Sequence, residues 1–194
     1  MAFKSISRRS FLKSTGVIAK GSFIVLTTPA LLAACQRAEE NLSSNEPAFK
    51  TLNDIEGKEL RAIAARIIPT DETPGAEEAG VIYFIDAVLG DDREDEYARV
   101  RLALREIQAM SAVKFDAAYF SDMTAPQQDE VLTEMETTSF FATVRYLTIA
   151  GMFSLPEYGG NKDKIGYQLI GFNDAHAWAP PYGFYDADYV EKGE

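Results

Sequence analysis

One stretch decides the fold class of this 194-residue chain: residues 60–69, LRAIAARIIP. Its apolar residues Leu60, Ile63, Ala64 and Ile67 recur at i, i+3, i+4 and i+7, which puts them on one face of an amphipathic helix. Pro69 predicts the end of that helix, because proline lacks the N–H that a helix interior needs.

Helical spacing continues along the chain. We predict a second helix over residues 81–90, a third over about residues 97–120, a fourth capped by Thr124, and a fifth over residues 140–151. Residues 164–172 (KIGYQLIGF) give the single strand-like signal. The pattern predicts an all-α fold: one mainly helical domain.

The composition excludes most of the common kinds of catalytic, cofactor and metal site. With one Cys and one His, the chain has no internal disulfide, no all-cysteine iron–sulfur cluster and no Cys- or His-rich metal site. No phosphate-binding glycine motif is present. His176 is interpreted as structural or surface-exposed, and the acidic residues 91–96 as a solvated helix start. We therefore predict no catalytic, cofactor or metal site on this chain.

Charge is distributed unevenly. Residues 1–35 contain five cations and no acid, so the remaining 159 residues hold 14 cations and 30 anions, a net charge of 14 − 30 = −16. Such an acidic remainder argues against nucleic acid as a partner, because the phosphates would repel it. It argues equally against electrostatic docking on anionic lipid.

The basic start contains a motif. Residues 7–13, SRRSFLK, resemble the twin-arginine export motif, with Arg8, Arg9, Phe11 and Leu12 as its specified residues. The apolar region that follows, residues 17–34, is too interrupted for a comfortable transmembrane helix. Residues 1–34 are therefore predicted to be a cleavable signal read by the twin-arginine translocase, which implies a periplasmic protein. The alternatives are a membrane anchor or a disordered arm.

Cys35 lies at the end of that region, in the sequence Leu32-Ala33-Ala34-Cys35. This resembles a bacterial lipobox, so Cys35 is a candidate for lipidation and membrane anchoring. The alternative is a simple cleavage site with the cysteine close by. Residues 35–50 are polar and unperiodic, as expected of a lipid-anchored or flexible tether. The helical domain is predicted over residues 51–194.

Two stretches carry a family resemblance. The first is residues 67–76, IIPTDETPGA, continuing to Asp86; the second runs from residue 140 to 172 and contains Pro156-Glu157-Tyr158-Gly159-Gly160-Asn161. Together they resemble the gluconate 2-dehydrogenase subunit 3 family, whose members are small exported partners of flavin-dependent dehydrogenases of the glucose–methanol–choline type. The resemblance covers roughly residues 50–175.

The resemblance implies a non-catalytic subunit. FAD and the substrate would be bound by a separate large subunit, and a c-type cytochrome subunit would carry electrons away. The small subunit would assist the folding and twin-arginine co-export of the large one. We expect partner contacts in the matched loops and the aromatic tail. The candidates are Pro69, Asp71, Pro74, Gly75, Tyr158, Gly159, Gly160, Asn161 and Trp178.

Other interpretations stay open at this point. The matched loops and the tail can instead brace the domain's own core. The chain can also be an independent envelope lipoprotein that binds a small ligand or another protein. A third interpretation is a self-contained enzyme that uses paired carboxylates such as Asp71 and Glu72, but adjacent acids in a turn usually point different ways and nothing else converges on them.

Overall fold

The computed structural model describes residues 21–24, 48–90 and 93–174. In these ranges it contains helices and turns and no strand, which confirms the all-α single domain. None of the described helices is long and apolar enough to cross a membrane. The helices are α3 (Asp54–Ile67), α4 (Val81–Leu89), α5 (Glu94–Phe115), α6 (Ala125–Met135), α7 (Ser139–Phe153) and α8 (Ile165–Leu169), with the 3-10 turns η1 (Phe120–Asp122), η2 (Pro156–Tyr158) and η3 (Lys162–Lys164).

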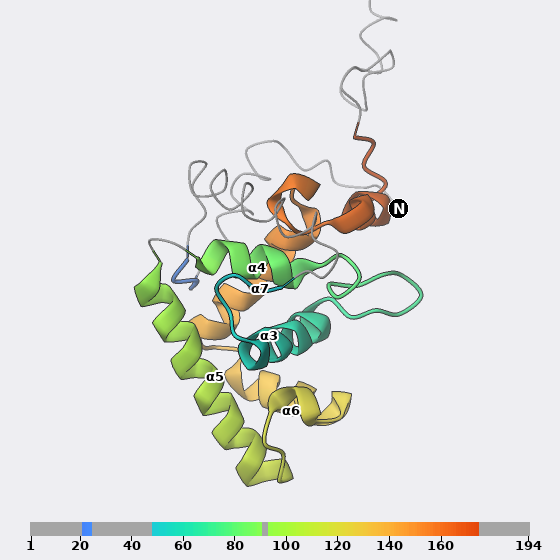
Figure 1. Cartoon of the computed structure of the whole chain (residues 1–194). Coiled ribbons are helices and arrows are strands. Elements are labelled where there is room, and N and C mark those ends of the chain that lie inside the picture. Colours follow the sequence, from blue (N-terminus) through green and yellow to red (C-terminus); the bar gives the residue numbers. More distant parts are fainter. Residues whose placement is uncertain (1–20, 25–47, 91–92, 175–194) are drawn as a thin grey trace, which may run out of the picture.

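Helix α4 lies at the centre of the domain (Figure 1). Its sequence, VIYFIDAVL, is apolar on almost every side, and every residue except Tyr83 is buried. A helix that is apolar all round is stable only when other elements cover it. Helices α3 and α7 do so and also contact each other, and Phe84, Ile63 and Leu147 form part of the shared core.

Helices α5 and α6 complete the domain. Helix α5 runs along one edge (Figure 1) and buries Val100, Leu104 and Ile107. Its first turn is acidic, as the sequence predicted, and acids there are favoured by the helix dipole. Helix α6 follows the predicted cap Thr124, whose N–H and hydroxyl both donate to the Gln127 side chain at 2.9 and 2.8 Å.

The predicted third helix is too long. Helix α5 ends at Phe115, and Asp116 follows in the left-handed conformation with φ 53°. The chain then turns so that Phe120, at the start of η1, is fully buried. The sequence prediction extended the helix to about Phe120 because the apolar spacing continues to Phe115, but the burial of Phe120 comes from this turn and not from helical spacing.

The strand-like signal in residues 164–172 does not correspond to a strand in the structure. Residues Ile165–Leu169 form α8. A Cβ on Gly166 would lie 1.9 Å from the carbonyl oxygen of Met152, so the backbone of α8 rests directly on α7. The N–H of Gly166 donates to the side chain of Asn161 at 2.8 Å. These contacts across the fold select a helical turn, and local sequence does not show them.

Residues from before position 51 also pack on the domain. The ring of Phe49 lies 5.8 Å from that of Tyr83 and covers Gly57, where a Cβ would overlap it. Residues 21–24, drawn blue in Figure 1, lie near α5 and α7, and Ile24 is fully buried. The packed body thus includes residues that the sequence assigned to the tether and the export segment.

Candidate functional site

Two loops meet where α7 ends and α4 begins. The first loop, residues 68–80, joins α3 to α4, and the second, residues 154–164, joins α7 to α8. Lys162 donates its backbone N–H to the carbonyl oxygen of Ala79 at 3.0 Å. A Cβ on Gly80 would lie 3.9 Å from the carbonyl oxygen of Gly159. The fold therefore brings both predicted contact motifs into one region.

The first loop presents most of its predicted residues to solvent. Pro69, Asp71 and Pro74 are exposed, and Gly75 is buried at the base of the loop. A Cβ on Gly75 would lie 2.6 Å from the carbonyl oxygen of Ile68, so this closure requires glycine. Figure 1 shows the loop extending away from the helices.

Internal hydrogen bonds shape this loop. The Glu78 carboxylate accepts from the hydroxyl of Thr70 at 2.6 Å and from the N–H of Gly75 at 3.0 Å. The Asp71 carboxylate accepts from the N–H and hydroxyl of Thr73 at 2.8 and 2.9 Å. These donors lower the pKa of both carboxyl groups below their ordinary values. The loop is thus preorganised, with Asp71 engaged by Thr73.

The second loop turns on a buried asparagine. Asn161 is fully buried in the left-handed conformation with φ 48°. Its side chain donates to the carbonyl oxygen of Ser154 at 2.8 Å and accepts from the N–H of Gly166 at 2.8 Å. A Cβ on Gly160 would lie 2.0 Å from the carbonyl oxygen of Gly151. The buried Gly159, with φ 91°, completes the turn.

For Gly159, Gly160 and Asn161, this geometry supplies the bracing role that the sequence left open. That they also contact a partner stays a prediction. Tyr158 is half-buried and packs against the core.

Exposed apolar side chains lie in the second loop and in the residues that follow it. Leu155, Leu169, Ile170 and Phe172 are 41, 40, 60 and 49% exposed. The ring of Phe172 also packs on the edge of Tyr167, with centroids 4.8 Å apart. Sequence reasoning did not identify Leu155 and Leu169 as surface residues. We call these four residues the apolar rim.

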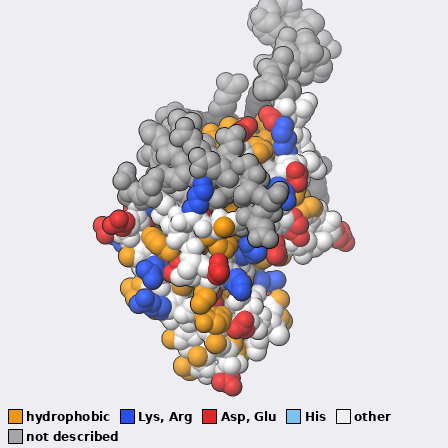
Figure 2. All heavy atoms as spheres, viewed as in Figure 1, with side chains coloured by type: hydrophobic (Ala, Val, Ile, Leu, Met, Phe, Trp, Pro, Cys, Tyr) orange, Lys and Arg blue, Asp and Glu red, His pale blue; other side chains and the backbone are white. Residues whose placement is uncertain are grey.

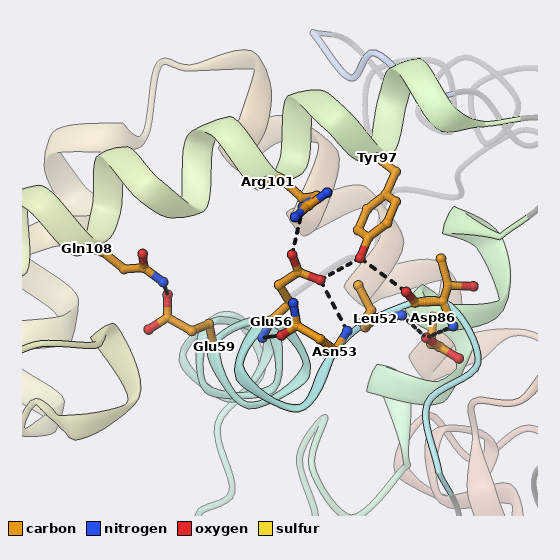
Figure 3. Close-up of polar contacts among 9 residues, drawn as sticks. Leu52, Asn53, Glu56, Glu59, Asp86, Tyr97, Arg101 and Gln108 are labelled. Carbon is orange, nitrogen blue, oxygen red and sulfur yellow. Dashed lines mark hydrogen bonds and ion pairs between the residues drawn. The ribbon is translucent and has the colours of Figure 1, made fainter.

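A buried polar network ties α3 to α5 (Figure 3). The Glu56 carboxylate accepts from the Tyr97 hydroxyl and from the N–H of Asn53, and it pairs with Arg101 at 2.9 Å. The Tyr97 hydroxyl also lies 3.1 Å from the carbonyl oxygen of Thr51. Burial, reinforced by the Glu56 carboxylate, raises the pKa of Tyr97 to about 12. The phenol is therefore held as a neutral donor.

Glu59 sits one turn further along α3 and is fully buried. Its carboxylate accepts from the N–H of Phe120 at 2.6 Å and from the side chain of Gln108 at 3.1 Å. Burial raises the pKa of Glu59 above its ordinary value, although these donors partly oppose that effect. This carboxyl group holds η1 and α5 against α3.

Asp86 is the single acid inside the apolar helix α4, and it is fully buried. Its carboxylate accepts three backbone N–H groups, from Lys50 at 2.9 Å, Thr51 at 3.0 Å and Leu52 at 2.8 Å. A buried charge of this kind is tolerated because hydrogen bonds replace its lost hydration. Asp86 therefore fastens the chain entering α3 to the central helix (Figure 3).

Sequence reasoning missed these three carboxylates, although a signal was present. Glu56 and Glu59 lie on the same helical face as Leu60 and Ile63, and Asp86 interrupts an apolar run. Acids in apolar stripes point to buried, hydrogen-bonded groups. Since the named oxygens already accept donors from the chain, the arrangement is that of structural carboxylates.

An open groove of about 430 Å³ lies between α3, α6 and α7. Arg66 and Asp129 form a two-point ion pair at its wall, at 2.7 and 2.8 Å, and Phe141 and Arg145 also line it. Among the described residues, no group of three or more His, Cys, Asp or Glu side chains is placed to hold a metal ion.

The remaining predicted residues lie outside the described ranges. They are Arg8, Arg9, Phe11 and Leu12 of the export motif, the lipidation candidate Cys35, His176, and Trp178 of the tail.

Comparison with known proteins identifies the family. The model of the family described as gluconate 2-dehydrogenase subunit 3 matches residues 54–174. No curated protein and no solved structure gives a match. The matched range begins at the first residue of α3, contains both loops and ends with the described residues. The chain therefore belongs to the gluconate 2-dehydrogenase subunit 3 family.

Proposed function

We propose that this chain is the non-catalytic small subunit of a periplasmic flavin-dependent dehydrogenase complex. It assists the folding, assembly and twin-arginine export of a large subunit that carries FAD and oxidises a sugar, sugar acid or alcohol. The observation that carries the proposal is the family match, which covers residues 54–174 and hence nearly the whole described domain.

The amino-terminal sequence supports the export role. A flavoprotein that binds its cofactor in the cytoplasm must cross the membrane already folded, and the twin-arginine route carries folded proteins. Arg8 and Arg9, with Phe11 and Leu12, supply that signal on the small chain. A lipid on Cys35 would then hold the complex at the membrane, where a c-type cytochrome subunit accepts its electrons.

The apolar rim and the first loop supply a docking surface for the large subunit. Apolar side chains that stay exposed beside a loop held by buried hydrogen bonds, as the second loop is by Asn161, are typical of interaction sites. Figure 2 shows other apolar side chains scattered among charges of both signs on the visible face. The rim residues Ile170 and Phe172 lie within the family-matched range, as do Pro69, Asp71 and Pro74. Tyr158, also in the matched range, packs against the core.

Co-expression with the large flavoprotein tests this function. The chain is expressed in three forms: unchanged, with Arg8→Lys and Arg9→Lys together, and with the control substitution Lys4→Arg. We expect the double variant to abolish flavoprotein in the periplasmic fraction, since lysines keep the charge but not the paired guanidinium groups. The control should export normally.

Periplasmic flavin content and dehydrogenase activity are the readouts. If export and stability of the large subunit are the same with the double variant, or without the chain, the proposal fails. The independent envelope lipoprotein then becomes the better account. Purified chain that oxidises a sugar alone would contradict the non-catalytic assignment.

A further inference from the structure

Residues 21–24, Gly-Ser-Phe-Ile, dock on the folded domain. The side chain of Ile24 is fully buried and belongs to the same core cluster as residues of α4 and α7. The N–H of Phe23 donates to the hydroxyl of Thr143 on α7 at 3.0 Å, across 120 positions of sequence. This is a specific contact that combines burial with a directed hydrogen bond.

The ring of Phe23 lies next to α5. The guanidinium carbon of Arg99 stands 5.7 Å from the ring centroid, within the range of a cation–π interaction. A groove of about 270 Å³ opens beside the ring, and Leu102, Met135 and Phe140 help to line it. We call the region formed by Arg99, Leu102, Phe140 and Thr143 the α5–α7 slot.

Within the docked segment, Ser22 satisfies the backbone polar groups of Ile24. The Ser22 hydroxyl donates to the carbonyl oxygen of Ile24 at 2.7 Å and accepts the N–H of Ile24 at 3.1 Å. Burying a segment outside a helix or sheet is costly when its backbone polar groups lose water without replacement. Here Ser22 and Thr143 provide the replacement, so the apolar side chains of residues 23 and 24 can leave water.

The same four residues lie inside the apolar region 17–34 that the sequence assigns to the export signal. We propose that the α5–α7 slot is a binding site for a short apolar segment, and that residues 21–24 of the unprocessed chain are its occupant. Docking restrains the signal, because these residues cannot lie in the slot and in the translocase at once.

The restraint depends on folding. Its groups come from α5 and α7, and they are assembled only when these helices have packed together. Only chains with an empty slot then have a free signal. The export rate is therefore reduced in proportion to the fraction of chains whose slot is occupied. The docking itself is independent of the proposed function, whereas its effect on export rests on that function.

Amide hydrogen exchange on the full chain tests the docking. Thr143→Val removes the hydroxyl that accepts the Phe23 N–H and keeps the branched shape. Thr148→Val is the matched control, since Thr148 is a buried threonine of α7 whose hydroxyl likewise donates to a helix carbonyl. We expect Phe23 exchange to speed up about tenfold or more in Thr143→Val and to stay unchanged in the control.

A second pair of variants distinguishes a loss of docking from a folding defect. Arg99→Ala removes the cation over the Phe23 ring, and Arg105→Ala removes another exposed arginine of α5 that does not line the groove. Arg99→Ala should also speed Phe23 exchange. The docking is overturned if Phe23 exchanges as fast in the unchanged chain as in the slot variants, or if slot and control variants act alike.

Export kinetics test the restraint. We expect the two slot variants to export about threefold faster or more than their controls, because more signal is free. Protected Phe23 with equal export rates would overturn the restraint. Protected Phe23 in the unchanged chain, together with slot variants that are also never exported, would contradict the proposed function and leave the docking intact. A chain that is exported although its Phe23 amide is unprotected would agree with the proposed function and contradict the docking.

Discussion

Glu59 shows how one buried carboxyl group sets a pH dependence. Its pKa is raised by burial, so the folded state holds the proton more tightly than the unfolded chain does. The contribution of Glu59 to the free energy of unfolding is therefore fully present below the ordinary carboxyl pKa of 4.5. It is lost as the pH rises through the pKa of the folded state.

Glu59→Gln removes that titration and keeps an oxygen for the N–H of Phe120. We expect the variant to gain stability relative to the unchanged chain as pH rises from about 4 to about 8, by at most about 1.4 kcal/mol per pH unit. Urea unfolding at several pH values measures the difference. A difference that stays constant with pH would show that Glu59 does not titrate in this window.

A substitution at Gly160 tests how closely the second loop packs on α7. Gly160→Ala would place a Cβ 2.0 Å from the carbonyl oxygen of Gly151, and backbone on both sides has little room to move. We expect a loss of about 3 kcal/mol or more. The control is Gly171→Ala, which meets nothing within 4 Å and bears only the strain of φ +66°, about 1–2 kcal/mol. Equal losses in denaturant unfolding would contradict this packing.

At the scale of elements, Asp86 joins the segment before α3 to α4. Asp86→Asn keeps one acceptor oxygen and introduces an amide donor facing backbone N–H groups. We expect a loss of about 2–4 kcal/mol, with faster amide exchange at residues 50–52. Asp163→Asn, an exposed control, should change stability by no more than about 0.5 kcal/mol. Unchanged exchange at residues 50–52 would disprove the tether.

The sequence predicted elements well where the signal is local. Leu60, Ile63 and Pro69 define α3, and Thr124 marks the start of α6, because spacing, proline and caps act within a few residues. It failed where distant contacts decide. Phe120 is buried by a turn, and Gly166 rests on the backbone of α7. Such contacts appear only once the helices are assembled.

The candidate site was likewise predicted where the signal is local and missed where distant contacts decide. The matched motifs located the two loops, but not their meeting through Lys162 and Ala79, which depends on how α4 and α7 pack. Nor did they show that Asn161 turns inward while Ile170 faces solvent. The docking of Ile24 was invisible for a further reason, since an apolar signal segment gives no indication of what it will contact.

At the scale of the whole molecule, the chain combines a helical body with a net negative charge, and a group of exposed apolar side chains lies at the second loop. Its net charge is −11, or −16 beyond residue 35 by 14 cations against 30 anions. Ile170, 60% exposed, lies at the apolar rim, and Val113, 87% exposed, lies on α5. Together they offer a matched pair for testing where the large subunit binds.

Affinity purification of the chain from native membranes tests the central claim most directly, with bound flavin measured per chain. We predict that a large flavoprotein copurifies with the unchanged chain and with Val113→Asp. Ile170→Asp should lower the flavin recovered about tenfold or more, because a charge at an apolar contact is costly to bury. A chain that purifies without flavin, or flavin recovery that Ile170→Asp and Val113→Asp change equally, would contradict the account.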